Sequence, residues 1–183
     1  MVVIDLGSGI APVGVSELKR WARIARDDED ETLRLLIAAA NAAIEAEVGI
    51  VLARRQFRLI VDERPKDGRV QPTKTPVVSV DAVFGYGADG TETVFDPEIE
   101  TTISRDGLSV ELSSDVWAAS PNGVDVTVTA GLAAHDVPAP AKHAILVAAA
   151  SWFETRTEAE EGAARFLPSN ALRLVRSLKR VRL

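Results

Sequence analysis

The chain has 183 residues, no cysteine and a formal net charge of −6 at pH 7. The lack of cysteine excludes thiol catalysis, disulfides and zinc sites built on thiolates. The first residues show no basic segment followed by an apolar run, and no stretch reaches the roughly 18 apolar residues of a membrane helix. We therefore expect a soluble protein without an export signal, made in the cytoplasm.

The charge is unevenly distributed along the chain. No acidic residue follows Glu161, and residues 162–183 carry +6, which leaves −12 on residues 1–161. Such asymmetry indicates that the basic end meets something that the acidic body does not, either an acidic protein surface or nucleic acid phosphate.

Residues 1–14 hold three glycines and a proline and are predicted to form an extended arm, which either packs on another subunit or is a loosely held terminus. A first helix is predicted from Val15 to about Arg26, with Ser16 as its N-cap. The residues expected on its buried face are Leu18, Trp21, Ile24 and Ala25.

An acidic run, residues 27–31, precedes a second helix that is expected to end at Gly49 in a left-handed cap. Its apolar residues have nearly ideal helical spacing: Leu33, Leu36, Ile37, Ala40, Ile44 and Val48. Negative charge favours a helix N-terminus. A calcium loop would need alternating ligands followed by glycine, and position 32 is threonine, so the pattern favours a solvated helix start.

From Arg54 the hydrophobic period changes from 3.6 to 2, which predicts strands. The candidates are residues 56–61, 77–86, 91–95, 99–104, 108–112 and 124–130. Residues 87–90, Gly-Ala-Asp-Gly, are expected to form the turn of a hairpin. These five or six strands suggest an antiparallel sheet or small sandwich with one solvated face.

A third helix is predicted from Pro138 to Arg156, because two prolines mark its start and apolar residues follow at helical spacing. Its other faces are also rich in alanine and valine, so we expect one face to hold the domain together and another to meet a neighbouring copy. The candidate subunit-interface residues are Ala148, Ala149 and Trp152.

A last helix is predicted after Pro168, with an apolar face and a basic face. Its apolar residues are Ala171, Leu174, Val175, Leu178 and Val181, and the opposite side carries Arg173, Arg176 and Arg180. The helix could bind nucleic acid through its charge, but no aromatic residue lies between the basic ones and the acidic body repels DNA. Docking on an acidic protein partner is the better interpretation.

No catalytic, cofactor or metal site is predicted. Residues 85–90 match G-x-G-x-x-G, but a strand is expected to follow where a dinucleotide site needs a helix. His135 and His143 are the only histidines and lack a third ligand or an activated nucleophile. We expect Trp21 and Trp152 in the core, and Trp117 in the core or at a partner contact.

The order of these segments resembles the head-to-tail connector, or adaptor, family of tailed bacteriophages and related gene-transfer particles. The resemblance spans about residues 15–183 and rests on segments in a fixed order: VSELKRWARI, LLIAAANAAIEAEVG, RRQFRL, TPVVSVDAVFGYGADGTE, VTVTAG and VPAPAKHAILVAAASWFETR.

The resemblance implies a structural role. Members form a ring, usually of twelve copies, between the portal and the next tail-side protein, and their carboxy-terminal segment reaches the portal. The portal-binding candidates in this chain are then Arg173, Arg176, Leu178, Lys179, Arg180, Val181, Arg182 and Leu183. The charge of −12 on residues 1–161 suggests an acidic channel that lets DNA pass without sticking.

We therefore expect an α+β fold: a helical bundle built from both ends of the chain, with an inserted antiparallel β region. The parts of this single domain, 1–183, are the arm 1–14, the helical part 15–49 and 138–183, and the β region 53–131. Residues 171–183 are expected to be removable without loss of the fold. The expected function is a connector between portal and tail; the alternative is a small nucleic-acid-binding protein that uses the basic last helix.

Overall fold

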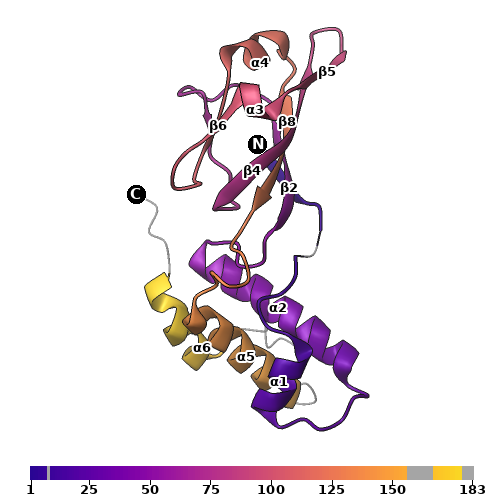
Figure 1. Cartoon of the computed structure of the whole chain (residues 1–183), viewed down its shortest axis with the longest axis vertical. Coiled ribbons are helices and arrows are strands. Elements are labelled where there is room, and N and C mark those ends of the chain that lie inside the picture. Colours follow the sequence, from indigo (N-terminus) through magenta and orange to yellow (C-terminus); the bar gives the residue numbers. More distant parts are fainter. Residues whose placement is uncertain (8, 156–166, 179–183) are drawn as a thin grey trace. The chain divides into compact units, whose positions relative to one another are not determined.

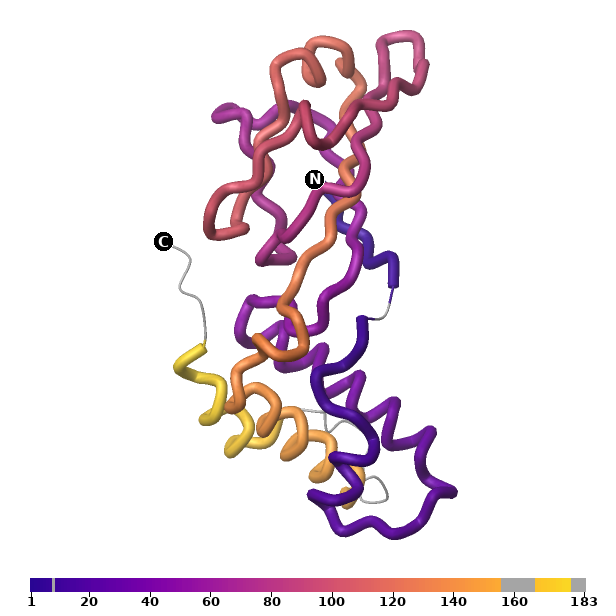
Figure 2. The backbone as a smooth tube through the Cα atoms, in the orientation of Figure 1, coloured from indigo at the N-terminus to yellow at the C-terminus, as the bar shows by residue number. Residues whose placement is uncertain are grey.

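The structure, a computed structural model, describes residues 1–7, 9–155 and 167–178. It is of the α+β class, as predicted, and divides into two compact units (Figure 1). The β unit consists of Met1–Gly9 and Arg54–Leu132, and the helical unit consists of Ile10–Ala53 and Ala133–Leu183. Figure 2 traces how the chain leaves the helical unit after α2 and returns to it before α5.

The helical unit is centred on one long helix. Its elements are α1 (Val15–Ala22), α2 (Asp30–Val48), α5 (Ala139–Glu154), α6 (Ser169–Val175) and the 3₁₀ turn η1 (Arg176–Leu178). α5 packs against α1, α2 and α6, and α6 also contacts α2. Six of the 16 residues of α5 are buried, and most are alanine, which lets the neighbouring helices approach closely: Ala141, Ala144, Ile145, Leu146, Ala148 and Ala149.

The second helix forms as predicted. The residues Leu33, Ile37, Ala40, Ile44 and Val48 are buried, and Leu36 is half-buried. Gly49 ends α2 with φ +71°, and its N–H donates to the Glu45 carbonyl over 2.9 Å. A residue with a side chain would be strained in this left-handed conformation, which explains the glycine.

The first helix is shorter than predicted. α1 ends at Ala22 because Arg23 takes a left-handed conformation, φ 55°, and the N-cap is Gly14, not Ser16. Of the predicted buried face only Leu18 is fully buried, and Ala25 is exposed. Trp21, expected in the core, is 49% exposed. The chain leaves the helix at Arg23, so the helical spacing no longer sets the direction of the residues that follow.

α6 belongs to the packed interior of the helical unit. Ala171 and Val175 are fully buried, and Leu174 and Leu178 are half-buried. The expectation that residues 171–183 could be removed without loss of the fold conflicts with this packing. Lys179, Arg180, Val181, Arg182 and Leu183 lie outside the described residues.

The β unit contains two antiparallel sheets. The larger has the order β1 (Val2–Asp5), β2 (Arg55–Val61), β8 (Val124–Ala130), β4 (Val77–Tyr86) and β5 (Glu92–Phe95). The smaller has the order β3 (Arg69–Val70), β7 (Val110–Leu112) and β6 (Thr101–Ile103). All pairings are antiparallel, as predicted. The predicted arm contributes the edge strand β1, which pairs with β2.

The larger sheet has one buried and one polar face. Alternate residues of β2 and β8 are buried, among them Phe57, Leu59, Val126 and Val128, while Gln56, Arg58, Thr127 and Thr129 alternate with them. The predicted hairpin is present as β4 and β5, joined through Gly90 with φ +82°.

Two short helices of the β unit were not predicted, α3 (Pro97–Glu100) and α4 (Ser114–Ala119). Each begins with a side-chain cap: Asp96 accepts from the N–H of Glu98, and Ser113 accepts from the N–H of Val116. Trp117 lies in α4 and is buried, with 8% of its surface exposed.

Candidate interaction surfaces

A groove of about 550 Å³ crosses the helical unit where α1, α5 and α6 meet. We call it the Trp21 groove; its lining residues are Trp21, His143, Val147, Asn170, Arg173 and Leu174. The rings of Trp21 and His143 meet edge to face, with centroids 4.8 Å apart and an interplanar angle of 70°. A half-exposed tryptophan beside half-buried apolar side chains is typical of a surface that another protein covers.

Arg173 gives the groove a positive charge. Its side chain is exposed and makes no ion pair with any residue in the described part of the chain. Of the predicted portal-binding residues, Arg176 is also exposed and Leu178 is half-buried. The sequence prediction placed Arg173 on the basic face of the last helix but did not connect it with Trp21, because nothing in the spacing shows that α1 lies beside α6.

The predicted subunit-interface residues lie on α5. Ala148 and Ala149 are completely covered by the helical unit's own atoms, and Trp152 is half-buried. Any effect of the two alanines on a neighbouring copy must therefore act through the packing of α5 against the other helices.

Ion pairs organise the acidic run before α2. The Lys19 ammonium donates to Asp27 and to Asp30, the latter over 2.8 Å. These hydrogen bonds raise the pKa of Lys19, and the bond from Lys19 holds the pKa of the Asp27 carboxyl below its usual range. Within residues 1–7, 9–155 and 167–178 there is no cluster of side chains that could hold a metal ion.

A charged triad lies on the polar face of the larger sheet. Asp125, only 4% exposed, accepts from Arg58 Nε over 2.9 Å, from Arg58 Nη2, and from the Tyr86 hydroxyl over 3.1 Å. The hydrogen bond to Asp125 raises the pKa of Arg58. Burial raises the pKa of Tyr86 above its ordinary value of 10.0, and its bond to Asp125 adds to the effect. The triad ties β2, β8 and β4 together.

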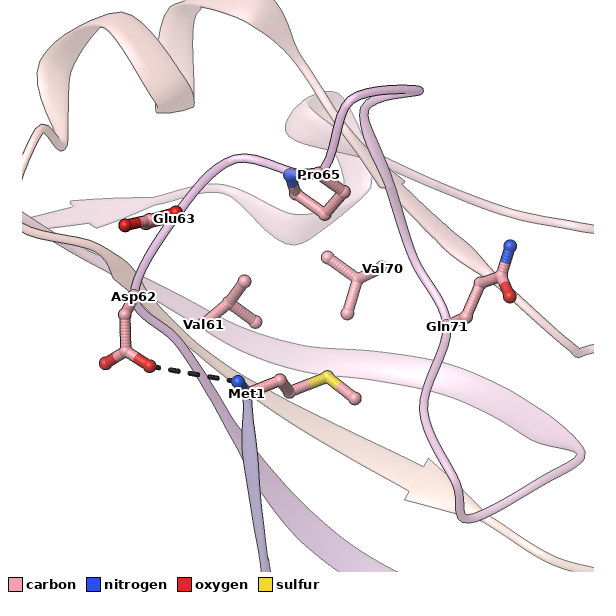
Figure 3. Close-up of a pocket in the computed structure, with 7 residues that line it drawn as sticks. All are labelled: Met1, Val61, Asp62, Glu63, Pro65, Val70 and Gln71. Atoms are coloured by element: carbon pink, nitrogen blue, oxygen red, sulfur yellow. Dashed lines mark ion pairs between the residues drawn. The ribbon is translucent and has the colours of Figure 1, made fainter.

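The β unit has a smaller pocket of about 390 Å³, shown in Figure 3. The side chains of Val61, Val70 and Met1 give it an apolar lining, and Asp62 and Glu63 add negative charge. The Met1 ammonium lies 3.8 Å from Asp62. The apolar part of this lining suits the binding of an apolar side chain.

The glycines of the G-x-G-x-x-G match have a structural explanation. β5 follows the match, as predicted, so no helix N-terminus is available for a pyrophosphate. A Cβ on Gly85 would lie 1.9 Å from Ser120 Oγ and 2.7 Å from the Phe95 ring, so this position admits only glycine.

The two histidines have different surroundings. His135 Nε2 lies 3.4 Å from its neighbour Asp136 on the surface, while His143 contacts Trp21 in the groove. The helices within the described part of the chain are all too short or too polar to cross a membrane.

Comparison with known proteins identifies the family. Residues 13–117 match the family described as phage gp6-like head-tail connector protein. No curated protein sequence matches the chain.

Three solved structures are similar over 100% of this chain and 97% of theirs. They are the virion of a native gene transfer agent (GTA) particle, at 25% identity and a TM-score of 0.80; the neck of a native GTA particle computed with C12 symmetry, at 25% and 0.73; and the neck of an empty GTA particle computed with C6 symmetry, at 24% and 0.78. Since the family match spans more than half of the chain, the protein belongs to the phage gp6-like head-tail connector family and is a structural component of the head-tail junction of a phage-like particle.

Proposed function

We propose that this chain forms a ring of twelve copies between the portal and the next tail-side connector protein, and that it acts by assembly and not by catalysis. The observation that carries the proposal is the similarity, over the whole chain, to a subunit of a GTA neck computed with C12 symmetry. A cyclic ring needs two different contact patches on each copy, and the helical unit offers more than one exposed face.

In this proposal the chain is one functional domain whose helices, drawn from both ends of the sequence, form the ring-building bundle. The packing of α5 between α2 and α6 supports this role. The inserted β region, 53–131, supplies the tail-side or outer surface, where the pocket near Val70 is available for a partner.

The basic end of the chain docks on the portal. Arg176 is exposed on the last helical segment beyond the Trp21 groove, and residues 179–183 add three basic residues in sequence. Trp152 contributes directly to the contact between copies, while Ala148 and Ala149 act on it through the packing of α5.

Co-purification with the portal protein tests this role. Deleting residues 179–183 leaves all of α6 in place, so the variant should fold and form rings but lose portal binding. Replacing the exposed Arg64 and Lys66 of the β unit by serine is the matched control for lost positive charge, and should leave portal binding unchanged. Portal binding that survives the deletion together with Arg176→Ser would exclude the basic end as the docking segment.

DNA passes through the ring without being bound, because residues 1–161 carry −12 and repel phosphate. The purified protein should therefore not retard duplex DNA in a gel at physiological salt. Tight retardation, abolished by removal of the basic end, would favour the alternative of a small nucleic-acid-binding protein.

A further inference from the structure

The Trp21 groove is a surface of the helical unit with room for another protein's side chains. Among described residues, the large apolar side chains of this unit with much exposed surface are Ile10, Trp21 and Leu35. Trp21 lies in the groove, and Leu35 is 65% exposed on α2. Leu35 is therefore available for contact with another protein.

Leu35 belongs to a complete exposed face of α2. Exposed residues recur at the spacing of one helix face, Glu31, Leu35, Ala38, Ala42 and Ala46, and the exposed Arg34 lies beside them, paired with Glu31 over 2.8 Å. At 100° per residue this face lies opposite the buried residues Leu33, Ile37 and Ile44. A leucine followed by alanines one turn apart allows a helix to approach a partner closely. We call these five residues the outer face of α2.

The two surfaces carry opposite charge. The groove holds Arg173, which makes no ion pair with any described residue. The outer face begins in the acidic run: residues 27–34 hold five carboxylates and one basic side chain, Arg34, and Lys19 and Arg26 also form ion pairs with the run. The start of α2 therefore keeps a net negative charge.

We infer that the outer face of α2 of one copy lies in the Trp21 groove of the next copy in the ring. The inference rests on the proposed ring and names its contact. Charge favours this pairing over symmetric ones, because groove against groove would bring two Arg173 side chains together and α2 against α2 would bring two acidic runs together. A contact between two different patches is also the type that closes into a ring.

Cysteine cross-linking tests the contact, since the natural chain has no cysteine. The double variants Leu35→Cys with Asn170→Cys, and Leu35→Cys with Val147→Cys, are assembled and treated with a short bifunctional maleimide. Both should give a ladder of covalent oligomers, because each copy then offers one cysteine to either neighbour. The single variants, and the control pair Val78→Cys with Asn170→Cys, should give no ladder.

A substitution provides a second readout. Leu35→Asp should raise the protein concentration needed for half-maximal assembly by about tenfold or more, as loss of a central apolar contact does. Val94→Asp is the control, because Val94 is similarly exposed, at 68%, in the β unit. Leu35 is on the surface, so the circular dichroism and unfolding of the monomer should stay unchanged.

The outcomes separate the inference from the proposed function. Wild-type rings without a ladder from either groove cysteine, or with assembly unaffected by Leu35→Asp, overturn the contact and leave the ring intact. If wild-type protein forms no ring alone or with portal, the proposed function fails, and the inference fails with it. A ladder that requires Ile10→Cys in place of Leu35→Cys would assign the groove to the segment before α1 and overturn the assignment to α2.

Discussion

Glu45 is a carboxylate in the interior of the helical unit, with 7% of its surface exposed. One of its oxygens accepts from Asn41 Nδ2 over 3.1 Å and from the backbone N–H groups of Leu52 and Ala53 over 2.7 and 3.0 Å. It thereby fixes the turn that follows α2. Glu45→Ala removes this acceptor from buried donors, so we expect a loss of about 2–4 kcal/mol in the free energy of unfolding, measured in urea.

Glu45→Gln is the matched control for this prediction. Its amide oxygen can still accept the same N–H groups, so its loss of stability should be clearly smaller than that of Glu45→Ala. Equal losses for the two variants would show that the charge of Glu45, and not its hydrogen bonds, stabilises the turn.

Tyr86 is the only tyrosine of the chain, so its ionisation can be followed by absorbance alone. Its pKa lies above the ordinary 10.0, first because of burial and then because its hydroxyl donates to Asp125. A raised pKa in the folded state contributes stability that is present at neutral pH and is lost as the pH rises through it. Asp125→Asn should lower the pKa of Tyr86 toward 10; an unchanged titration would contradict the hydrogen bond.

Where the sequence patterns gave the wrong surroundings for a residue, those surroundings are formed by residues distant in the chain. Trp21 was expected in the core on helical spacing, but its surroundings are set by His143 and by residues of α6. Asp125 falls in a predicted strand, and nothing nearby shows that Arg58, 67 residues earlier, would pair with it. Periodicity reports which face a residue lies on, but not what covers that face.

At the scale of elements, α5 sets how closely the helices of the helical unit pack against one another. Ala148 and Ala149 have no exposed surface, and α5 contacts α1, α2 and α6. Ala148→Leu adds three carbon atoms where no space exists, so we expect it to cost about 1–3 kcal/mol of unfolding free energy, with weaker ring assembly as a consequence. Thermal unfolding and mass measurement of the assembled protein give the two readouts.

Ala139→Leu is the control for the same helix, because Ala139 is exposed in the first turn of α5. It should leave both stability and assembly unchanged. If Ala148→Leu keeps the monomer's stability and still abolishes the ring, the alanines contact the neighbouring copy directly, and the closed packing described above does not persist in the ring.

The elements with long, regular patterns could be predicted, and the short ones could not. α2 and α5 have 19 and 16 residues and repeat their apolar spacing over several turns. α4 has six residues, too few for a period, and its start depends on the single cap Ser113. The first helix was predicted to be too long because it ends at Arg23, which takes a left-handed conformation that glycine or asparagine usually takes at the end of a helix.

At the scale of the whole molecule, the larger part of the β unit, residues 54–132, is inserted between α2 and α5 through two neighbouring strand ends, and residues 1–9 add the edge strand β1. Arg55 and Ala130 are partners in the antiparallel pairing of β2 with β8, so the two ends of this inserted part lie about 5 Å apart. We expect residues 10–178 with 54–132 replaced by a short glycine-serine linker to fold into α1, α2, α5 and α6, as judged by circular dichroism and cooperative unfolding. Since both patches of the inferred contact lie on this unit, Leu35→Cys with Asn170→Cys should still cross-link within it. A folded unit that no longer cross-links would mean that the β unit takes part in the contact between copies.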